Sequence, residues 1–274
     1  MTLQIYDRWM RAREYSAGTI QKYSRDVARF FRETNAPPVP DKQTVADWRD
    51  SLVARGYSAA SVNAMLAAVN SYQECCGNPQ GKAKPLKCQR RVFCDAGREL
   101  NRAEYFRLLQ AARETGRKRT LLVLQTLCAT GIRVSELAYI TVEAVRRGRA
   151  SIRCKGKCRD ILLPGRLCKR LQRWCAKQRI HAGPVFVTRG GRPLDRVTVW
   201  KEMKALCKRA GVAKEKVFPH NLRHLFARTF YRIEKNLSKL ADLLGHSSIE
   251  TTRIYIMESG AEHQRLLEQM HLLL

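Results

Sequence analysis

Negative charge is scarce in this sequence. Only 24 of the 274 residues are Asp or Glu, against 52 Lys and Arg, which gives a formal net charge of +28. This imbalance excludes an acidic, solvating chain and predicts a polyanionic partner, although a merely soluble basic protein would show the same charge. Apolar residues make up 45% of the chain, which is enough for packed cores and argues against disorder throughout.

Long apolar runs are also missing. No stretch approaches the ~20 apolar residues that a membrane-spanning helix needs. The longest candidate, TLLVLQTLCATGI at 120–132, is interrupted by polar residues and predicts a buried helix instead. The first ten residues lack the basic start and apolar centre of a signal peptide. We therefore expect no membrane association, a cytoplasmic location and reduced cysteines.

Cysteines are plentiful, but the spacing of metal ligands is missing. The chain has ten cysteines and no Cys-x-x-Cys pair. Cys154 and Cys158 are close in sequence, as are Cys75 and Cys76, yet no histidine lies nearby at ligand spacing. The pattern predicts buried or incidental cysteines and no metal site.

Residues 1–80 predict a small bundle of four helices. Apolar residues recur at helical spacing, serines stand at positions suited to N-caps, and three prolines separate the second helix from the third. Basic side chains between the apolar positions of the second helix are candidate phosphate contacts. The predicted helices cover 3–14, 16–34, 44–56 and 58–77, and the candidate contacts are Lys22, Arg25 and Arg29.

Residues 81–97 predict a basic linker. Glycine, proline and basic residues follow one another from residue 78 without helical periodicity. The segment fits an ordinary solvated connector, a strand that runs across a polyanion, or both. Its candidate contacts are Lys82, Lys84, Lys87, Arg90 and Arg91.

Residues 98–274 predict a second domain that contains a little β-structure. Short apolar runs around a Lys-Gly turn predict a β-hairpin at 148–165, and 184–195 predicts a strand and a loop. This part carries 37 basic and 15 acidic residues, a net of +22, whereas residues 1–97 carry 15 and 9, a net of +6. The fold class is therefore mainly α with a small β-sheet, in two domains. The predicted helices cover 102–116, 118–131, 165–178, 197–211, the region 219–255 and the tail 261–274.

The segment 219–255 gathers the residues best suited to chemistry. It contains His220, Arg223, His246 and Tyr255. A guanidinium fits phosphate oxygens, an imidazole moves protons near neutral pH, and a phenol can form a covalent intermediate. His220 and Arg223 lie one helical turn apart, and the Gly-His-Ser-Ser sequence places His246 at a corner between helices. The set suits attack on a phosphate diester, although any one of these residues alone would also fit a core position.

The amino-acid sequences of these segments resemble those of a known family. HNLRH and LGHSSIETTRIY resemble the second motif block of the tyrosine recombinase (phage integrase) family, and ATGIRVSEL at 129–137 resembles the first. Both blocks stand in the family's order. TIQKYSRDVARFF and SVNAMLAAVNSYQ resemble its core-binding domain, so the resemblance covers nearly the whole chain. The compact plan, with no arm-binding domain before the bundle, resembles Xer-type recombinases and small integrases of mobile elements.

The resemblance implies a catalytic site with assigned roles. Tyr255 would be the nucleophile, Lys155 in the hairpin turn the general acid, with Lys157 as the neighbouring alternative, and Glu136 a supporting residue beside the first arginine. His224 is interpreted as structural, because it follows Arg223 directly and would face another side of the helix. The implied catalytic residues are Arg133, Lys155, His220, Arg223, His246 and Tyr255.

The resemblance also implies a reaction and partners. Tyr255 would form a 3′-phosphotyrosyl link and release a 5′ hydroxyl, with no metal and no nucleotide cofactor. The implied partner is double-stranded DNA with inverted-repeat core sites, bound by a homo-tetramer on paired sites. The tail helix would dock on a neighbouring subunit or pack on its own domain. The target sequence, the directionality and any accessory protein are not indicated.

Two other functions remain open at the level of sequence. A type IB topoisomerase uses similar tyrosine chemistry and would relax DNA without strand exchange. A DNA-binding protein that never cleaves would also be basic, although it would not need Tyr255 and both arginines together. The sequences of the two motif blocks and the predicted helical N-terminal bundle favour the recombinase.

Overall fold

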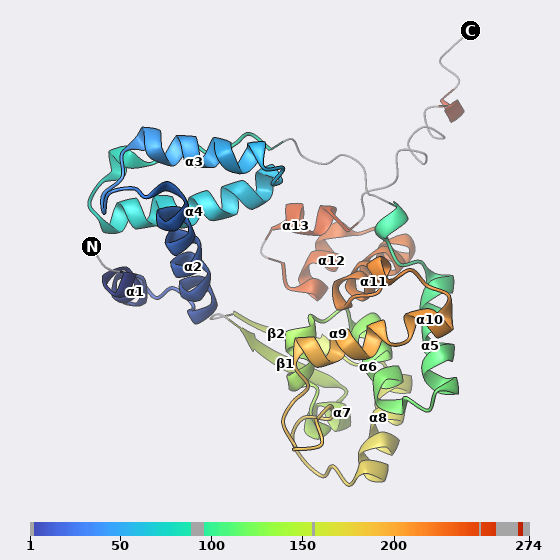
Figure 1. The fold of residues 1–274 in the computed structure, drawn as a ribbon. Helices are drawn as coiled ribbons and strands as arrows, with labels where there is room; N and C mark the ends of the chain where they lie inside the picture. Colours follow the sequence, from blue (N-terminus) through green and yellow to red (C-terminus); the bar gives the residue numbers. More distant parts are fainter. Residues whose placement is uncertain (1–2, 89–95, 155–156, 247, 256–267, 271–274) are drawn as a thin grey trace. The chain divides into compact units, whose positions relative to one another are not determined.

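The computed structural model describes residues 3–88, 96–154, 157–246, 248–255 and 268–270. The chain divides into two compact units, Met1–Arg90 and Arg91–Leu274 (Figure 1). The described residues are mostly helical and contain one two-stranded sheet, which confirms the predicted fold class. The division between the units falls within the segment predicted as a linker.

Side-chain caps start the helices of the N-terminal unit at the predicted places. Ser16 accepts from the backbone N–H of Thr19 at 3.3 Å, and Ser58 accepts from that of Ser61 at 3.3 Å. Each cap satisfies one of the N–H groups that the first helical turn leaves without a partner. The elements are α1 (Leu3–Ala12), α2 (Ala17–Thr34), α3 (Lys42–Ala54), α4 (Ala59–Cys75) and the 3-10 helix η1 (Pro79–Gly81).

Aromatic side chains fill the core of this unit. Phe30 of α2 meets Trp48 of α3 edge to face, with ring centroids 5.2 Å apart. Both rings are buried, and the Trp48 Nε1 donates to Glu33 at 2.8 Å, so the polar end of the indole is also satisfied. Burial of each such side chain contributes about 1.5–3 kcal/mol to the free energy of folding. The apolar stripes predicted from sequence are therefore used for packing.

The first part of the predicted linker is bound to the N-terminal unit. Asn63 of α4 pairs with the backbone of Leu86, donating to its carbonyl at 2.9 Å and accepting from its N–H at 2.8 Å. Asn70 pairs in the same way with Ala83, at 2.9 and 3.2 Å. These side-chain amides satisfy the backbone N–H and C=O groups of the extended segment, as a neighbouring strand would. The segment is thus held against α4 as far as Leu86.

The C-terminal unit begins with helices that position the later elements. Asn101 and Glu104 form a reciprocal capping box at the start of α5. The next helix, α6, ends at Gly131 in the left-handed conformation (φ 64°). The elements are η2 (Ala96–Arg98), α5 (Arg102–Glu114), α6 (Lys118–Thr130), η3 (Val134–Tyr139), α7 (Val142–Arg147), β1 (Arg149–Cys154), β2 (Lys157–Leu162), α8 (Gly165–Gln178), α9 (Arg196–Lys204), α10 (Cys207–Ala210), η4 (Lys214–Lys216), α11 (Pro219–Glu234), α12 (Leu237–Leu244) and α13 (Ile249–Arg253).

The predicted β-hairpin is confirmed. Strands β1 and β2 pair antiparallel, with Ala150 opposite Ile161 and Ile152 opposite Arg159. Ala150, Ile152 and Ile161 are buried, so this face of the hairpin packs on the core. The turn residues 155–156, which include Lys155, lie outside the described residues.

Two predictions about local structure were wrong. Residues 184–195 form no strand and contribute only isolated bridges, Thr141 with Pro184 and Val187 with Pro193. The second bridge is followed at once by a turn, in which the N–H of Gly191 donates to the carbonyl of Thr188 at 3.1 Å, so the pairing cannot lengthen into a ladder there. The helix predicted over 197–211 is two helices, α9 and α10, separated by Ala205 and Leu206. Most of the predicted tail helix lies outside the described residues.

Within the described part of the chain, no helix combines the length and the apolar character needed to cross a membrane.

Candidate active site

Helix α11 carries three of the side chains at the centre of the site. Pro219 occupies its first turn, where a missing N–H costs nothing and the fixed φ favours helix. His220, Arg223 and His224 follow within the first two turns, so their side chains lie on neighbouring parts of the helix surface. The predicted pairing of His220 with Arg223 on one helix is confirmed by the bounds of α11.

Arg223 is the largest fully buried side chain of the described chain, with 1% of its surface exposed. Its Nη1 donates to the carbonyl of Gly131 at 2.5 Å, and its Nη2 donates to that of Leu244 at 2.7 Å. These carbonyls close helices α6 and α12, whose C-terminal ends carry partial negative charge. The Nε is also buried and has no hydrogen-bond partner among the described residues. Burial lowers the pKa of Arg223, and the nearby Tyr255 opposes that shift.

His246 lies at the predicted corner between two helices. Gly245 ends α12 in the left-handed conformation (φ 64°), and Ser248 precedes α13. The Nε2 of His246 lies 2.8 Å from Nη2 of Arg223, and its Nδ1 lies 2.7 Å from Oγ1 of Thr252. Burial, followed by the charge of Arg223, lowers the pKa of His246 to about 4. The ring is therefore neutral at pH 7, with Nε2 as acceptor and Nδ1–H as donor.

Tyr255 lies against all three histidines of this region. It follows α13 and exposes only 5% of its surface. Its ring stacks on His246, with centroids 5.5 Å apart and planes at 14°, and its Oη lies 3.5 Å from Nε2 of His220. His220 is exposed as a residue, yet partial desolvation of its ring, and next the charge of Arg223, lower its pKa. A neutral imidazole next to the phenol can accept its proton.

His224 belongs to this cluster, which the sequence analysis did not anticipate. Its ring centroid lies 4.4 Å from that of Tyr255 and 4.8 Å from that of His220, in edge-to-face contacts. The spacing of four residues from His220 was the available signal, because i and i+4 share a helix face. Burial lowers the pKa of His224 to about 4. The residue thus packs directly against the phenol.

Arg133 and Glu136 form a second group beside Arg223. The Nη1 of Arg133 lies 3.1 Å from Oε1 of Glu136, and about half of the Arg133 side chain is exposed. Glu136 itself is buried and also accepts from Nη2 of Arg159 at 2.5 Å. A Cβ added at Gly131 would lie 2.3 Å from the ring of Phe226, so only glycine fits this junction.

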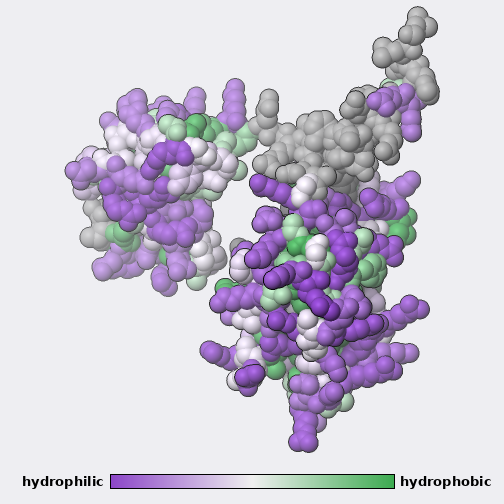
Figure 2. All heavy atoms as spheres, turned by 45° about the vertical axis from the view of Figure 1, so that its right-hand side comes forward, coloured by the Kyte–Doolittle hydropathy of each residue, from purple (hydrophilic) through white to green (hydrophobic). Residues whose placement is uncertain are grey.

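The candidate DNA contacts of the N-terminal unit are mostly engaged in ion pairs. Lys22 pairs with Asp26 at 2.7 Å and Arg29 with Glu33 at 2.8 Å. Lys82 pairs with Glu74, and Arg25 lies 3.3 Å from Asp26 with three quarters of its side chain exposed. Figure 2 shows that hydrophilic side chains cover most of the visible face of each unit. Lys84 and Lys87 are exposed, and Arg90, Arg91 and Lys155 lie outside the described residues.

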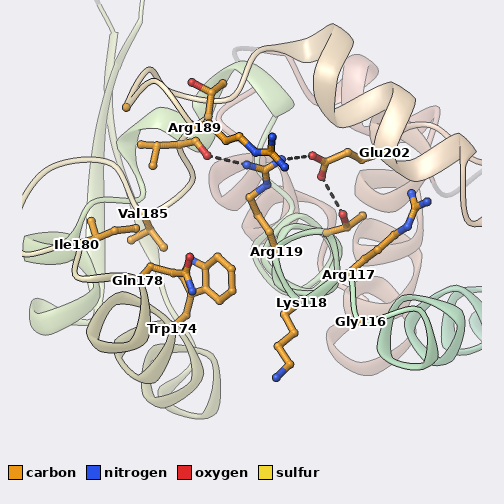
Figure 3. Close-up of a pocket in the computed structure, with 14 residues that line it drawn as sticks. Gly116, Arg117, Lys118, Arg119, Trp174, Gln178, Ile180, Val185, Arg189 and Glu202 are labelled. Carbon is orange, nitrogen blue, oxygen red and sulfur yellow. Dashed lines mark hydrogen bonds and ion pairs between the residues drawn. The ribbon is translucent and has the colours of Figure 1, made fainter.

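A cavity of about 780 Å³ lies elsewhere in the C-terminal unit (Figure 3). Arg119 crosses it and donates to the carbonyl of Val187 at 2.9 Å and to Glu202, while Trp174 contributes an aromatic wall. None of the arginine, histidine and tyrosine residues described above lines it. The tyrosine site is thus separate from this cavity.

The residues that the structure describes contain no group of three or more His, Cys, Asp or Glu side chains able to hold a metal ion.

Two histidines make the stability of this unit depend on pH. The pKa values of His224 and His246 are about 4, below the ordinary value of 6.5. As the pH falls below 6.5, the unfolded chain binds protons at these rings before the folded chain does, so the unfolding free energy decreases until about pH 4. We expect urea denaturation to show this decrease between pH 7 and pH 4.5. A His224→Asn variant should show a shallower pH dependence, and an unchanged one would contradict the prediction.

The fold and the site together define a class of protein. A helical N-terminal bundle accompanies a mainly helical unit in which a buried tyrosine lies against three histidines, beside a buried arginine, the arrangement expected of a tyrosine recombinase. The chain belongs to the phage integrase family: the family model described as "Phage integrase family" matches residues 98–262, and that of the "Phage integrase, N-terminal SAM-like domain" matches residues 4–75.

Individual relatives agree with this assignment. The chain is 26% identical over 278 residues to tyrosine recombinase XerA of Pyrococcus furiosus, covering 99% of this chain and 94% of that protein. Its fold is similar to that of the XerH site-specific recombinase bound to difH substrate (TM-score 0.70, 20% identity, 97% of this chain and 84% of that chain). It is also similar to a lambda integrase tetramer bound to a Holliday junction (TM-score 0.71, 20% identity, 92% and 75%).

Proposed function

We propose that this recombinase cuts and rejoins double-stranded DNA at inverted-repeat core sites through a 3′-phosphotyrosyl intermediate. The observation that carries the proposal is the position of Tyr255, held against His220, His224 and His246 beside the buried guanidinium of Arg223. The chain thereby brings together a nucleophile, a proton acceptor and a guanidinium that can donate hydrogen bonds to a phosphate. The N-terminal unit would hold the DNA, and the protein would act in the cytoplasm.

The chemistry follows from the atoms that meet at the site. The Tyr255 oxygen forms a bond to the scissile phosphorus and passes its proton toward Nε2 of His220, 3.5 Å away. The bond from phosphorus to the 5′ oxygen breaks, and Lys155 supplies the proton that this oxygen needs. Arg133 and Arg223 donate to the phosphate oxygens where negative charge develops. The phosphotyrosyl link keeps the energy of the broken bond, so rejoining requires neither a metal nor a nucleotide.

The charge of the chain supports a DNA substrate. The net charge is +28, and 22 of these charges belong to residues 98–274, which contain the tyrosine site. Contacts between basic side chains and phosphates provide most of the affinity of a protein for DNA and make this affinity depend on the salt concentration. Two proteins that share the fold are bound to DNA: XerH to its difH substrate and lambda integrase to a Holliday junction.

The direct test is incubation with duplexes from candidate genomic or element ends. A covalent protein–DNA adduct that appears only with certain duplexes supports a site-specific enzyme. Strand exchange between two such duplexes would then distinguish a recombinase from an enzyme that only cuts and reseals. Relaxation of supercoiled DNA without exchange would indicate a type IB topoisomerase. Binding without any adduct would indicate a protein that does not cleave.

We further propose that four subunits act together on two DNA sites. Two duplexes that exchange strands need four nucleophiles, and cyclic head-to-tail contacts close such a ring most simply. The leucine-rich tail, which lies largely outside the described residues, is the candidate for the element donated to a neighbouring subunit. Leu266, Leu267, Met270 and Leu273 or Leu274 would otherwise present an apolar surface.

Deletion of residues 262–274 tests this arrangement. The truncated protein should stay folded and bind a single site, yet form no stable complex of two sites and cleave roughly tenfold or more slowly, because the neighbouring tail would help to place Tyr255. Sizing of protein–DNA complexes, together with the adduct assay, measures both effects. Four-subunit complexes that still recombine would show that the tail packs only on its own unit.

A further inference from the structure

Arg159 is a charged residue at a core-facing position of the hairpin. It pairs with Ile152 across the sheet, on the same face as the buried pair Ala150 and Ile161. Only 15% of its side chain is exposed. A guanidinium at such a position is costly unless its donors are satisfied, so its partners indicate what it does.

The two ends of the Arg159 fork bind groups from different parts of the site. Nη2 donates to Oε2 of Glu136 at 2.5 Å, and Glu136 in turn accepts from the backbone N–H of Arg133 at 2.7 Å. Nη1 donates to the carbonyl of Leu243 at 3.1 Å. The next carbonyl, that of Leu244, accepts from Arg223. Two arginines therefore hold consecutive carbonyls at the end of α12.

The stem of Arg159 also lies against the corner that carries His246. A Cβ added at Gly245 would lie 2.4 Å from Cδ of Arg159. The corner glycine and the arginine are thus in direct contact, and Gly245 immediately precedes His246. Through these contacts one side chain links the hairpin, the Arg133–Glu136 group and the end of α12.

We propose that Arg159 is a positioning residue for DNA cleavage, which holds the Arg133–Glu136 group and the His246 corner at a fixed separation around the scissile phosphate. It acts through Glu136 and the end of α12 and does not touch the phosphate itself. Lysine cannot replace it, because a single ammonium cannot span both acceptors with the planar fork that an arginine provides. The proposal rests on the cleavage activity proposed above.

The test compares Arg159→Lys with the intact protein in two measurements. We expect DNA affinity to stay within about threefold, since the phosphate contacts that dominate affinity are kept. The single-turnover rate of adduct formation should fall about 100-fold, the loss expected when reacting groups shift by about 1 Å. Arg107→Lys is the matched control, because Arg107 holds the carbonyls of Ala210 and Gly211 at 3.0 and 3.4 Å outside the tyrosine site. This control should cleave at the normal rate.

A double-mutant cycle with Glu136→Gln separates positioning from a general loss of folding. If Arg159 acts through Glu136, the rate of the double variant should match that of the slower single variant instead of falling by the product of both losses. Multiplicative losses, or normal cleavage by Arg159→Lys, would overturn the proposal. If the intact protein and Arg107→Lys also form no adduct, the failure lies in the proposed function and not in the role of Arg159.

Discussion

Tyr255→Phe is expected to bind DNA with an affinity within about threefold of normal and to form no covalent adduct. Affinity comes mainly from phosphate contacts, whereas the phenol oxygen is the atom that must bond to phosphorus. Loss of a nucleophile reduces turnover by roughly six orders of magnitude, which is below detection in an adduct assay. The Oη lies 3.5 Å from its imidazole neighbour, too far for a strong hydrogen bond, so its removal should cost the fold little.

Tyr231→Phe is the control for this experiment. Tyr231 lies on α11 and packs beside the same small core that contains Tyr255, but no histidine ring contact is assigned to it among the described residues. The Tyr231 variant should form the adduct at the normal rate. An adduct that persists in Tyr255→Phe and disappears in Tyr231→Phe would transfer the nucleophilic role.

Lys155→Ala is expected to slow cleavage by roughly two to four orders of magnitude, the contribution typical of a general acid. The departing 5′ oxygen is a poor leaving group unless it receives a proton. A substrate in which sulfur replaces this bridging oxygen departs without help, and it should restore most of the lost rate. Single-turnover cleavage of both substrates measures the effect.

The neighbouring lysine decides whether the assignment is right. Lys157→Ala should cleave the ordinary substrate within a few-fold of the normal rate. A large loss in Lys157→Ala that the sulfur substrate restores would give Lys157 the role of general acid and leave Lys155 as a contact to the DNA backbone.

Much of the fold was predictable because it depends on local signals. Serine caps, helical periodicity and the glycine after α12 each act within a few residues, and the helices begin and end close to the predicted places. The central residues of the site were also predictable, since Arg223, His246 and Tyr255 are brought together within the C-terminal unit. The structure does not describe the turn with Lys155, and that assignment stays a prediction.

What was missed depends on contacts between residues distant in sequence. Arg159 was not anticipated because its partners lie 23 and 84 residues away. Nothing near residues 81–88 predicted that Asn63 and Asn70 would bind their backbone. The expectation that His224 faces another side of the helix was wrong, because a spacing of four residues places it next to His220 and against Tyr255. A strand was predicted at 184–195, but the segment turns back at residues 188–191 after a single bridge.

Three guanidinium groups gather around the single carboxylate of Glu136 and the end of α12. Arg133, Arg159 and Arg223 lie close enough for the first two to lower the pKa of the third, and Glu136 is the carboxylate that binds Arg133 and Arg159. A scissile phosphate would provide the missing negative charge. We therefore expect bound DNA to reduce the repulsion between these guanidinium groups and so to raise the unfolding free energy of this unit.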